Sequence, residues 1–255
     1  MKHGFSLVEL SIVLVILGLL TGGILTGQTL IRAAELRAVT TEFQRYQSAV
    51  NTFRDKYFAL PGDMRNATDF WEVFSNGGCP TGSGVGTETC NGNGNGIIEQ
   101  PGGANQAGEM FTFWQQLANA GLIEGQYTGI TGSGGAAHAT ADNVPQSKMT
   151  SGAWFSYNWN NTFSGISSAF DGTYTENSLQ FGGFSASGSP ATSILRPEEA
   201  WNIDTKMDDG KPAYGMMRER FWDDCTTAIA SSNLDADYLL TETAAVCTPF
   251  FYGPF

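Results

Sequence analysis

Basic residues and histidine are scarce in this 255-residue chain, and each shortage excludes a class of function. Lys and Arg number 13 against 25 Asp and Glu, which gives a formal net charge of -12. An acidic surface repels phosphate backbones, so the composition argues against nucleic-acid binding. Two histidines, His3 and His138, are too few for a histidine-rich metal site. No nucleophile with a neighbouring base stands out either, so we expect a protein that is not an enzyme.

An ordinary secretory signal is also missing, although the chain opens with a long apolar run. The 22 residues of Leu10–Ile31 carry no charge, and as a helix they would cover the ~30 Å hydrocarbon core of a bilayer. No small-x-small cleavage site follows before the composition changes, so we expect this segment to stay in the mature protein. Lys2 indicates a cytoplasmic N-terminus, whereas Arg32 and Arg37 weaken that assignment from the other side.

Glu9 lies at the edge of this apolar run, where a carboxylate costs on the order of 2.5 kcal/mol or more and needs a partner. The stretch GFSLVELSIVLVILGLL resembles the processing site and transmembrane helix of type IV pilins and of the pseudopilins of type II secretion. The resemblance implies that a prepilin peptidase cleaves between Gly4 and Phe5 and methylates the new Phe5 amine. It also implies that Glu9 of an incoming subunit pairs with the Phe5 amine of a neighbour, because both charges would be costly in an apolar filament core. The alternative is a glutamate that simply lies in the headgroup region.

The same resemblance implies a division of the chain and a location. Residues 1–4 would be the leader peptide, 5–31 the transmembrane half of a helix, 32–60 its soluble amphipathic half and 61–255 a globular pilin-like domain. The protein would cross the bacterial inner membrane once, with the C-terminal domain in the periplasm, and would later join a filament. The implied partners are prepilin peptidase, other pilin or pseudopilin subunits and an inner-membrane assembly platform. Loss of the leader would leave His138 as the one histidine on which any catalytic site could depend.

Apolar periodicity extends the first helix well beyond the membrane segment. Apolar residues recur at spacings of three and four, which is the pattern of a helix that lays one face on a core. They are Leu36, Val39, Phe43, Tyr46, Val50, Phe53 and Tyr57. Proline and glycine in the segment from Leu60 to Asp63 then predict the end of the helix. We expect a rod from Phe5 to about Phe58.

The rest of the chain predicts an α+β fold. Its 32 glycines and 15% charged residues favour a loop-rich domain that contains β-strands. Further helices are predicted within residues 108–123 and 196–207, from apolar spacing and from a proline followed by acids. Short antiparallel strands are predicted at residues 153–159, 162–167 and 177–184. The expected architecture is one long N-terminal helix packed on a small antiparallel sheet, with glycine-rich loops.

One stretch that could bind a cation is NGNGNGIIE. Asn91, Asn93 and Asn95 alternate as oxygen ligands, with Glu99 beyond them, as in the first half of an EF-hand loop. Gly102 stands where that motif has its bidentate glutamate, so the neutralisation of charge would be weak. A plain series of Asn-Gly turns is the alternative.

A second candidate for Ca²⁺ lies in NIDTKMDDGKPAYG, where Asp204, Asp208 and Asp209 come close together. Its spacing resembles an Asp-rich turn of pilin-like proteins, and the resemblance implies a loop stabilised by calcium. The alternative is an acidic helix end followed by an Asp-Gly turn. Asp223 and Asp224 are further acids nearby in the sequence.

The four cysteines of an exported domain most economically form two disulfides. Three connectivities exist, and the pairs Cys79–Cys90 and Cys225–Cys247 close the shortest loops. The second pair resembles the C-terminal disulfide loop of many pilins.

Two functions follow from the resemblance. The first is a structural subunit of a type IV pilus or a type II secretion pseudopilus. The second is a minor pilin at a filament tip that binds a surface or a glycan through an aromatic-rich segment. The aromatic residues of that segment are Trp154, Phe155, Tyr157 and Trp159.

Overall fold

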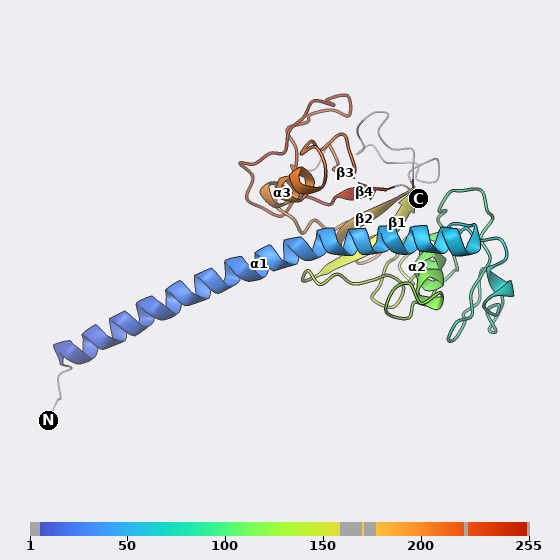
Figure 1. Cartoon of the computed structure of the whole chain (residues 1–255), viewed down its shortest axis with the longest axis horizontal. Helices are drawn as coiled ribbons and strands as arrows, with labels where there is room; N and C mark the ends of the chain where they lie inside the picture. Colours follow the sequence, from blue (N-terminus) through green and yellow to red (C-terminus); the bar gives the residue numbers. More distant parts are fainter. Residues whose placement is uncertain (1–5, 159–169, 171–176, 222–223, 254–255) are drawn as a thin grey trace.

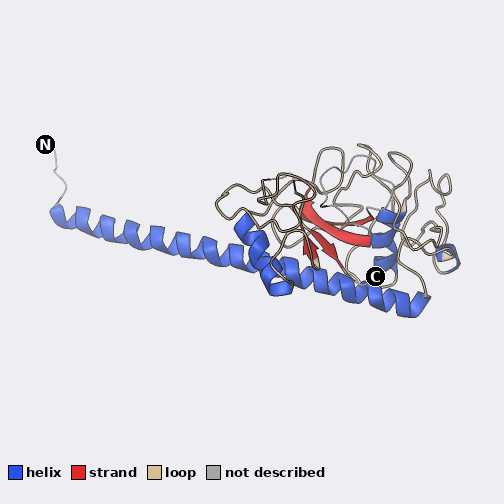
Figure 2. Cartoon of the chain, turned by 90° about the horizontal axis from the view of Figure 1, so that it is seen from above, coloured by secondary structure: helices blue, strands red, loops and turns tan. Residues whose placement is uncertain are grey.

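The computed structural model describes residues 6–158, 170, 177–221 and 224–253. One long helix extends far beyond the rest of the fold (Figure 1). The elements are α1 (Leu7–Tyr57), η1 (Ala67–Asp69), α2 (Glu109–Asn119), β1 (Gly152–Asn158), β2 (Asn177–Gly183), α3 (Pro197–Met207), β3 (Met217–Arg218) and β4 (Phe250–Tyr252). The described residues that follow α1, from residue 58 to residue 253, are called the head. Only the C-terminal half of α1 lies along the head (Figures 1 and 2). The predicted α+β class is confirmed.

The C-terminal half of α1 is held by the apolar stripe that the sequence predicts. Val39, Phe43, Val50 and Phe53 have no exposed surface, and Tyr46 is nearly as buried. The helix ends at Tyr57, and the next residue caps it in a left-handed conformation. The stripe therefore points into the head, and the amphipathic half of the helix is the spine of that domain.

The sheet has four antiparallel strands in the order β1-β2-β4-β3. Phe43 of α1 lies against this sheet, with ring centroids 5.0 Å from Phe251 and 6.4 Å from Trp154. The strands predicted at 153–159 and 177–184 correspond to β1 and β2, whereas the strand predicted at 162–167 lies outside the described residues. The two short strands β3 and β4 were not predicted from the sequence. The core of the head forms where this sheet meets α1.

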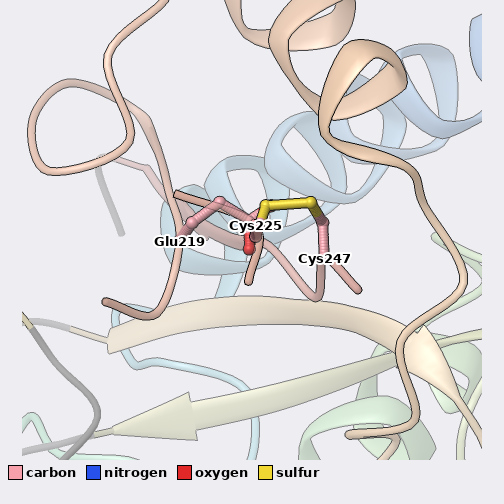
Figure 3. Close-up of side chains that lie close together, drawn as sticks. All are labelled: Glu219, Cys225 and Cys247. Atoms are coloured by element: carbon pink, nitrogen blue, oxygen red, sulfur yellow. A yellow bond between two sulfur atoms is a disulfide. The ribbon is translucent and has the colours of Figure 1, made fainter. Parts of the chain in front are cut away.

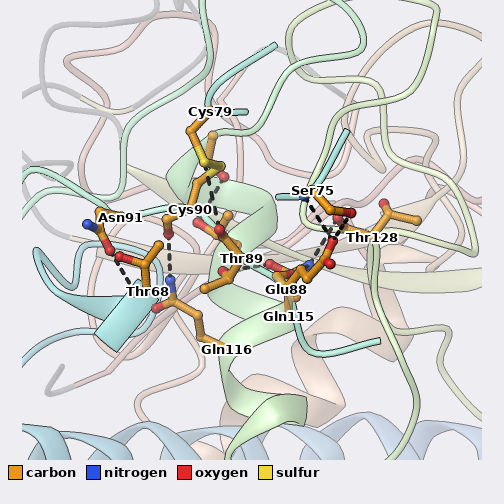
Figure 4. Close-up of a disulfide and its surroundings, with 12 residues drawn as sticks. Thr68, Ser75, Cys79, Glu88, Thr89, Cys90, Asn91, Gln115, Gln116 and Thr128 are labelled. Carbon is orange, nitrogen blue, oxygen red and sulfur yellow. Dashed lines mark hydrogen bonds between the residues drawn. A yellow bond between two sulfur atoms is a disulfide. The ribbon is translucent and has the colours of Figure 1, made fainter. Parts of the chain in front are cut away.

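The glycine-rich loop, residues 77–108, is held to α2 by two glutamine side chains (Figure 4). Gln115 donates to the carbonyl oxygen of Glu88 at 2.9 Å, and Gln116 donates to that of Cys90 at 3.2 Å. Cys90 is bonded to Cys79 within the same loop. These contacts give a segment with little regular structure a fixed place on the head.

The C-terminal part of the head is closed by the disulfide Cys225–Cys247. Glu219 lies beside this disulfide (Figure 3), and its carboxylate accepts a hydrogen bond from the backbone N–H of Thr248. Both cysteines are fully buried. Because their sulfur atoms are bonded to each other, this cluster of Glu219 and two cysteines has no thiolate to offer a metal ion.

Candidate functional site

The first turn of α1 is closed by a reciprocal pair of hydrogen bonds. The backbone N–H of Val8 donates to Oγ of Ser6 at 3.3 Å, and the backbone N–H of Ser6 donates to Oε2 of Glu9 at 2.8 Å. This is a capping box, in which a side chain at each end satisfies an orphan donor of the helix terminus. The spacing Ser-x-x-Glu in SLVE is the sequence signal of this cap, which was not among the predicted features. Gly4 and Phe5 lie outside the described residues.

Glu9 uses only one of its two carboxylate oxygens in this cap. Its Oε2 accepts from Ser6, and its Oε1 has no partner within the part of the chain that the structure describes. The helix N-terminus attracts negative charge, which favours a carboxylate in the first turn. Glu9 is thus positioned by its own helix, and its Oε1 accepts no hydrogen bond from the described residues.

None of the residues that the structure describes covers the apolar half of α1. Every residue from Ser6 to Thr26 is exposed, although most are Leu, Ile, Val or Gly. By length and composition this part of the helix could cross a membrane. A bare apolar surface of this size marks a site that another molecule or a membrane covers.

Comparison with known proteins finds one match, and it lies in this N-terminal segment. Residues 1–25 match the prokaryotic N-terminal methylation motif. The chain carries the signature of type IV pilins and pseudopilins. The motif implies processing by prepilin peptidase and assembly with other pilin subunits, and with the apolar helix it fits a membrane-anchored pilin. No curated protein and no solved structure matches the chain.

The motif also points to a structural subunit. His138, the histidine of the head, accepts a hydrogen bond at Nδ1 from the backbone N–H of Gly134 at 2.9 Å within a loop. The imidazole therefore helps to hold a turn of the head.

The Asn-Gly segment, residues 91–99, folds around carboxylates of the head. Asp63 accepts hydrogen bonds from the backbone N–H groups of Gly94, Asn95 and Gly96. Glu109, at the start of α2, accepts from the backbone N–H groups of Asn93 and Glu99, both at 2.9 Å. Sequence reasoning missed both acids.

The amide oxygens of the same segment are also engaged. Asn91 accepts from the backbone of Thr68, and Asn93 and Asn95 each accept from the backbone N–H two residues further on. Glu99 in turn accepts from the amide groups of Asn93 and Asn95. This geometry favours the series of Asn-Gly turns, and Ca²⁺ binding here stays a prediction.

The second candidate for a cation is brought together by the fold. Asp204, Asp208 and Asp209 place carboxylate oxygens within 4.8 Å of one another. Each carboxylate also has a partner of its own: Asp204 accepts from the hydroxyl of Tyr238 at 2.8 Å, and Asp208 and Asp209 accept from backbone N–H groups. Burial raises the pKa of Asp204 to about 7, and the two neighbouring aspartates add to the effect. Calcium binding at this cluster also stays a prediction.

The aromatic segment assigned to surface binding lies largely in the core. Trp154 and Phe155 are completely buried in β1, so they cannot contact a ligand at the surface. Trp154 packs on the rings of Phe181 and Phe251, with centroids 4.8 and 5.2 Å away. Trp159 lies outside the described residues. Aromatic side chains in a strand next to the main helix pack inward because burial of their large area dominates.

Proposed function

We propose that this chain is a structural subunit of a type IV pilus or of a type II secretion pseudopilus. Prepilin peptidase cleaves it between Gly4 and Phe5 and methylates the Phe5 amine. Before assembly the subunit spans the inner membrane once, with the head in the periplasm. An assembly platform in the inner membrane then moves it into a filament in which the apolar half of α1 packs against neighbouring helices.

The observation that carries this proposal is the uncovered apolar half of α1 directly after the methylation motif. The residues from Ser6 to Thr26 are exposed in the single chain, and burial against other helices would remove their apolar surface from water. Four glycines in or beside this segment have no neighbouring atom within 4 Å of an added Cβ, so they leave room for the close approach of another helix. They are Gly18, Gly22, Gly23 and Gly27.

Glu9 supplies the recognition step of the proposed assembly. An unpaired carboxylate is costly in an apolar filament core, and so is an unpaired ammonium group. The capping box already holds the Glu9 side chain at the helix N-terminus, with Oε1 available. Pairing of Oε1 with the Phe5 amine of a neighbour removes both penalties and sets the axial position of the incoming subunit.

The test is the intact mass of the chain after co-expression with a prepilin peptidase, with a Gly4→Glu variant as the matched control. We expect a membrane-extracted product that begins at Phe5 and carries one added methyl group. The control should keep Met1. A wild-type chain that also keeps Met1 would contradict the proposal, because the apolar helix would then be only an anchor.

A further inference from the structure

A groove of about 910 Å³ lies between α1 and α3, at the end of the head that is nearer to the apolar half of α1 (Figure 1). One wall is α1 from residue 30 to residue 41, and the other is formed by Asn202, Ile203 and Lys206 of α3. Leu30 belongs to the last turn of the uncharged apolar run, so the groove begins where the proposed membrane segment ends. It shares no residue with the Glu9 site or with either candidate cation site.

The part of the groove next to the membrane segment is apolar. Leu30, Ala33 and Ala34 are exposed on α1, and their spacing of three and four residues places them on one face of the helix. Leu36 is half-buried and Ile203 is buried, so these two side chains form the floor. The apolar surface of the membrane segment therefore continues into the groove, and a hydrocarbon chain that lies against the segment can extend along it.

Two cations line the groove beyond its apolar part, Arg37 from α1 and Lys206 from α3. Both side chains are exposed, and neither has a hydrogen bond or an ion pair within the described residues. Among those residues, no Asp or Glu lines the groove. An anion in the groove would therefore meet two positive charges and no carboxylate, although the formal net charge of the whole chain is -12.

Two carboxylates beside the groove are already engaged. Glu199 of α3 accepts from Arg32 of α1 at 2.6 and 2.7 Å. Glu35 accepts from Arg32 at 3.1 Å and from the hydroxyl of Thr150 at 2.7 Å. Arg32 therefore ties the two walls of the groove to each other, and its charge is balanced by acids of the chain. Arg37 is left as a cation of the groove that an outside ligand can reach.

The position of Arg37 along α1 matches the level of lipid headgroups. Arg37 lies six residues beyond Ile31, which is ~9 Å along the helix axis. The headgroup region extends roughly 5–8 Å beyond the hydrocarbon core of a bilayer. Because the side chains of an α-helix tilt toward its N-terminus, a long basic side chain at this position can reach back into that region. This placement rests on the proposed function, in which the apolar half of α1 spans the membrane before assembly.

We propose that the groove binds one anionic phospholipid of the membrane, whose phosphate pairs with Arg37 and Lys206 and whose acyl chain lies along Leu30, Ala33 and Ala34. A phosphodiester with an uncharged glycerol headgroup fits both cations, whereas the ammonium group of phosphatidylcholine or phosphatidylethanolamine is repelled by them. The apolar part of the groove selects a lipid over a free phosphate, because it offers a surface to the hydrocarbon chain. The lipid holds the head against the membrane until the subunit leaves the bilayer.

The experiment uses the full chain in lipid nanodiscs that contain equal amounts of phosphatidylglycerol, phosphatidylcholine and phosphatidylethanolamine. Native mass spectrometry counts the lipids that stay on the chain when it is released from the disc. We expect the chain to retain at least about tenfold more phosphatidylglycerol than phosphatidylcholine, since each basic side chain near a membrane surface strengthens binding to anionic lipid about fivefold. Lys2, at the other end of the membrane segment, is the same in every sample and gives a constant background.

Arg37→Gln and Lys206→Gln should each lower the ratio of retained phosphatidylglycerol to phosphatidylcholine by about fivefold, and the double variant should remove the preference. Both side chains are exposed, so we expect the variants to fold as the wild type does, which near-UV circular dichroism checks. Arg54→Gln is the matched control, because it removes an exposed arginine of the same helix outside the groove and should leave the ratio unchanged. Ala34→Trp keeps both charges but fills the groove, and it should lower the ratio as far as the double variant does.

Two results would overturn the lipid site. One is equal retention of the three lipids by a wild-type chain that has inserted into the discs. The other is a preference that survives in the double variant or in Ala34→Trp, because the charge of the surface as a whole, and not the groove, would then attract the lipid.

Insertion is measured first, by size-exclusion chromatography of the discs, and it separates this inference from the proposed function. A chain that does not insert contradicts the membrane-spanning position and the lipid site together. A chain that inserts without preferring phosphatidylglycerol contradicts only the lipid site. If Arg37→Gln then lowers the yield of filaments, the groove is a contact between subunits, and the proposed structural function still stands.

Discussion

The two halves of α1 form one continuous helix, but their side chains meet opposite surroundings. The half from Leu7 to Ile31 is apolar and almost entirely exposed, whereas the half from Val39 to Tyr57 buries its apolar stripe in the head. Both halves are therefore helical, and they differ only in whether the head packs on their apolar side chains. The difference shows that the head covers only the second half of the helix and leaves the apolar surface of the first half exposed.

Two glutamates of α1 differ in the same way, because one is exposed and the other is buried in the head. Glu9 is exposed in the described chain and shares one hydrogen bond with its own helix N-terminus. Glu42 is buried and accepts from the Ser147 hydroxyl, the Lys148 backbone and Nε1 of Trp154, at 2.7, 2.8 and 2.7 Å. The carboxylate of Glu42 is satisfied by the head, so the two acids should respond differently to loss of charge.

The largest effect is expected for Glu9→Gln in filament assembly. Glutamine keeps the capping box but removes the charge, so the helix begins normally and the pairing with the Phe5 amine is lost. We expect normal processing and at least about a tenfold loss of sheared filaments, measured by immunoblot against the membrane fraction. Equal filament yields from the wild type and Glu9→Gln would place Glu9 in the headgroup region instead.

Phe43→Ala and Leu17→Ala compare the two halves directly. Phe43 is fully buried between α1 and the sheet, so its truncation should cost about 3–5 kcal/mol and lower the melting temperature of the head by roughly 10 °C. Leu17 is exposed, and its truncation should leave that temperature unchanged. Thermal unfolding of the full chain in detergent, followed by near-UV circular dichroism, measures both. A similar loss in both variants would contradict the separation of the two halves.

Glu42→Gln should destabilise the head by about 2–3 kcal/mol, because a neutral amide cannot accept all three hydrogen bonds that the carboxylate accepts. Denaturant unfolding monitored by tryptophan fluorescence reports it, since Trp154 is one of the donors. Asp142→Asn, at an exposed acid whose side chain has no hydrogen bond within the described residues, is the control. If both variants unfold at the same denaturant concentration as the wild type, the buried carboxylate does not hold the head to α1.

The ion pair at the junction between the two halves should contribute less to the free energy of unfolding than Phe43 or Glu42 does. Arg32 donates to both carboxylate oxygens of Glu199 at 2.6 and 2.7 Å, and to the carbonyl oxygen of Ile194 at 3.0 Å. The pair is partly exposed, so we expect a coupling energy of about 1 kcal/mol. A double-mutant cycle with Arg32→Ala and Glu199→Ala measures it, and additive single effects would show that the pair does not couple.

The smallest expected effect is a dependence of stability on pH. Burial raises the pKa of Glu109 to about 7, and the charges of Asp63 and Glu99 act in the same direction, while two backbone hydrogen bonds oppose it. The folded chain therefore binds more protons than the unfolded chain between about pH 4.5 and 7. The stability that protonated Glu109 contributes is fully present below about pH 4.5 and is lost as the pH rises through about 7.

We expect the melting temperature to be about 3 °C higher at pH 5 than at pH 8 through this group. Glu109→Gln should reduce that difference, and Glu124→Gln, at an exposed acid, should not. An unchanged difference in Glu109→Gln would show that the carboxylate is already ionised in the folded chain at pH 5.

Local sequence patterns were sufficient to predict the main helices of the fold. The stripe from Val39 to Phe53 predicted the packed half of α1, and a proline followed by acids predicted α3 from Pro197 to Met207. The short strands β3 and β4 were missed because two or three residues contain too little alternation to be recognised. The aromatic residues of β1 were placed at the surface in one prediction, although their burial depends on the distant α1.

The sequence alone determined the apolar half of α1, the processing motif and the helical spine, because each depends on residues that are near one another in the chain. Only the tertiary structure decided which acids are buried and what they bond. Glu42 meets partners more than 100 residues away, and Asp63 and Glu109 gather a loop that the sequence suggested as a cation site. Such contacts depend on how the sheet and loops pack on α1, and no local pattern encodes the distance between those segments.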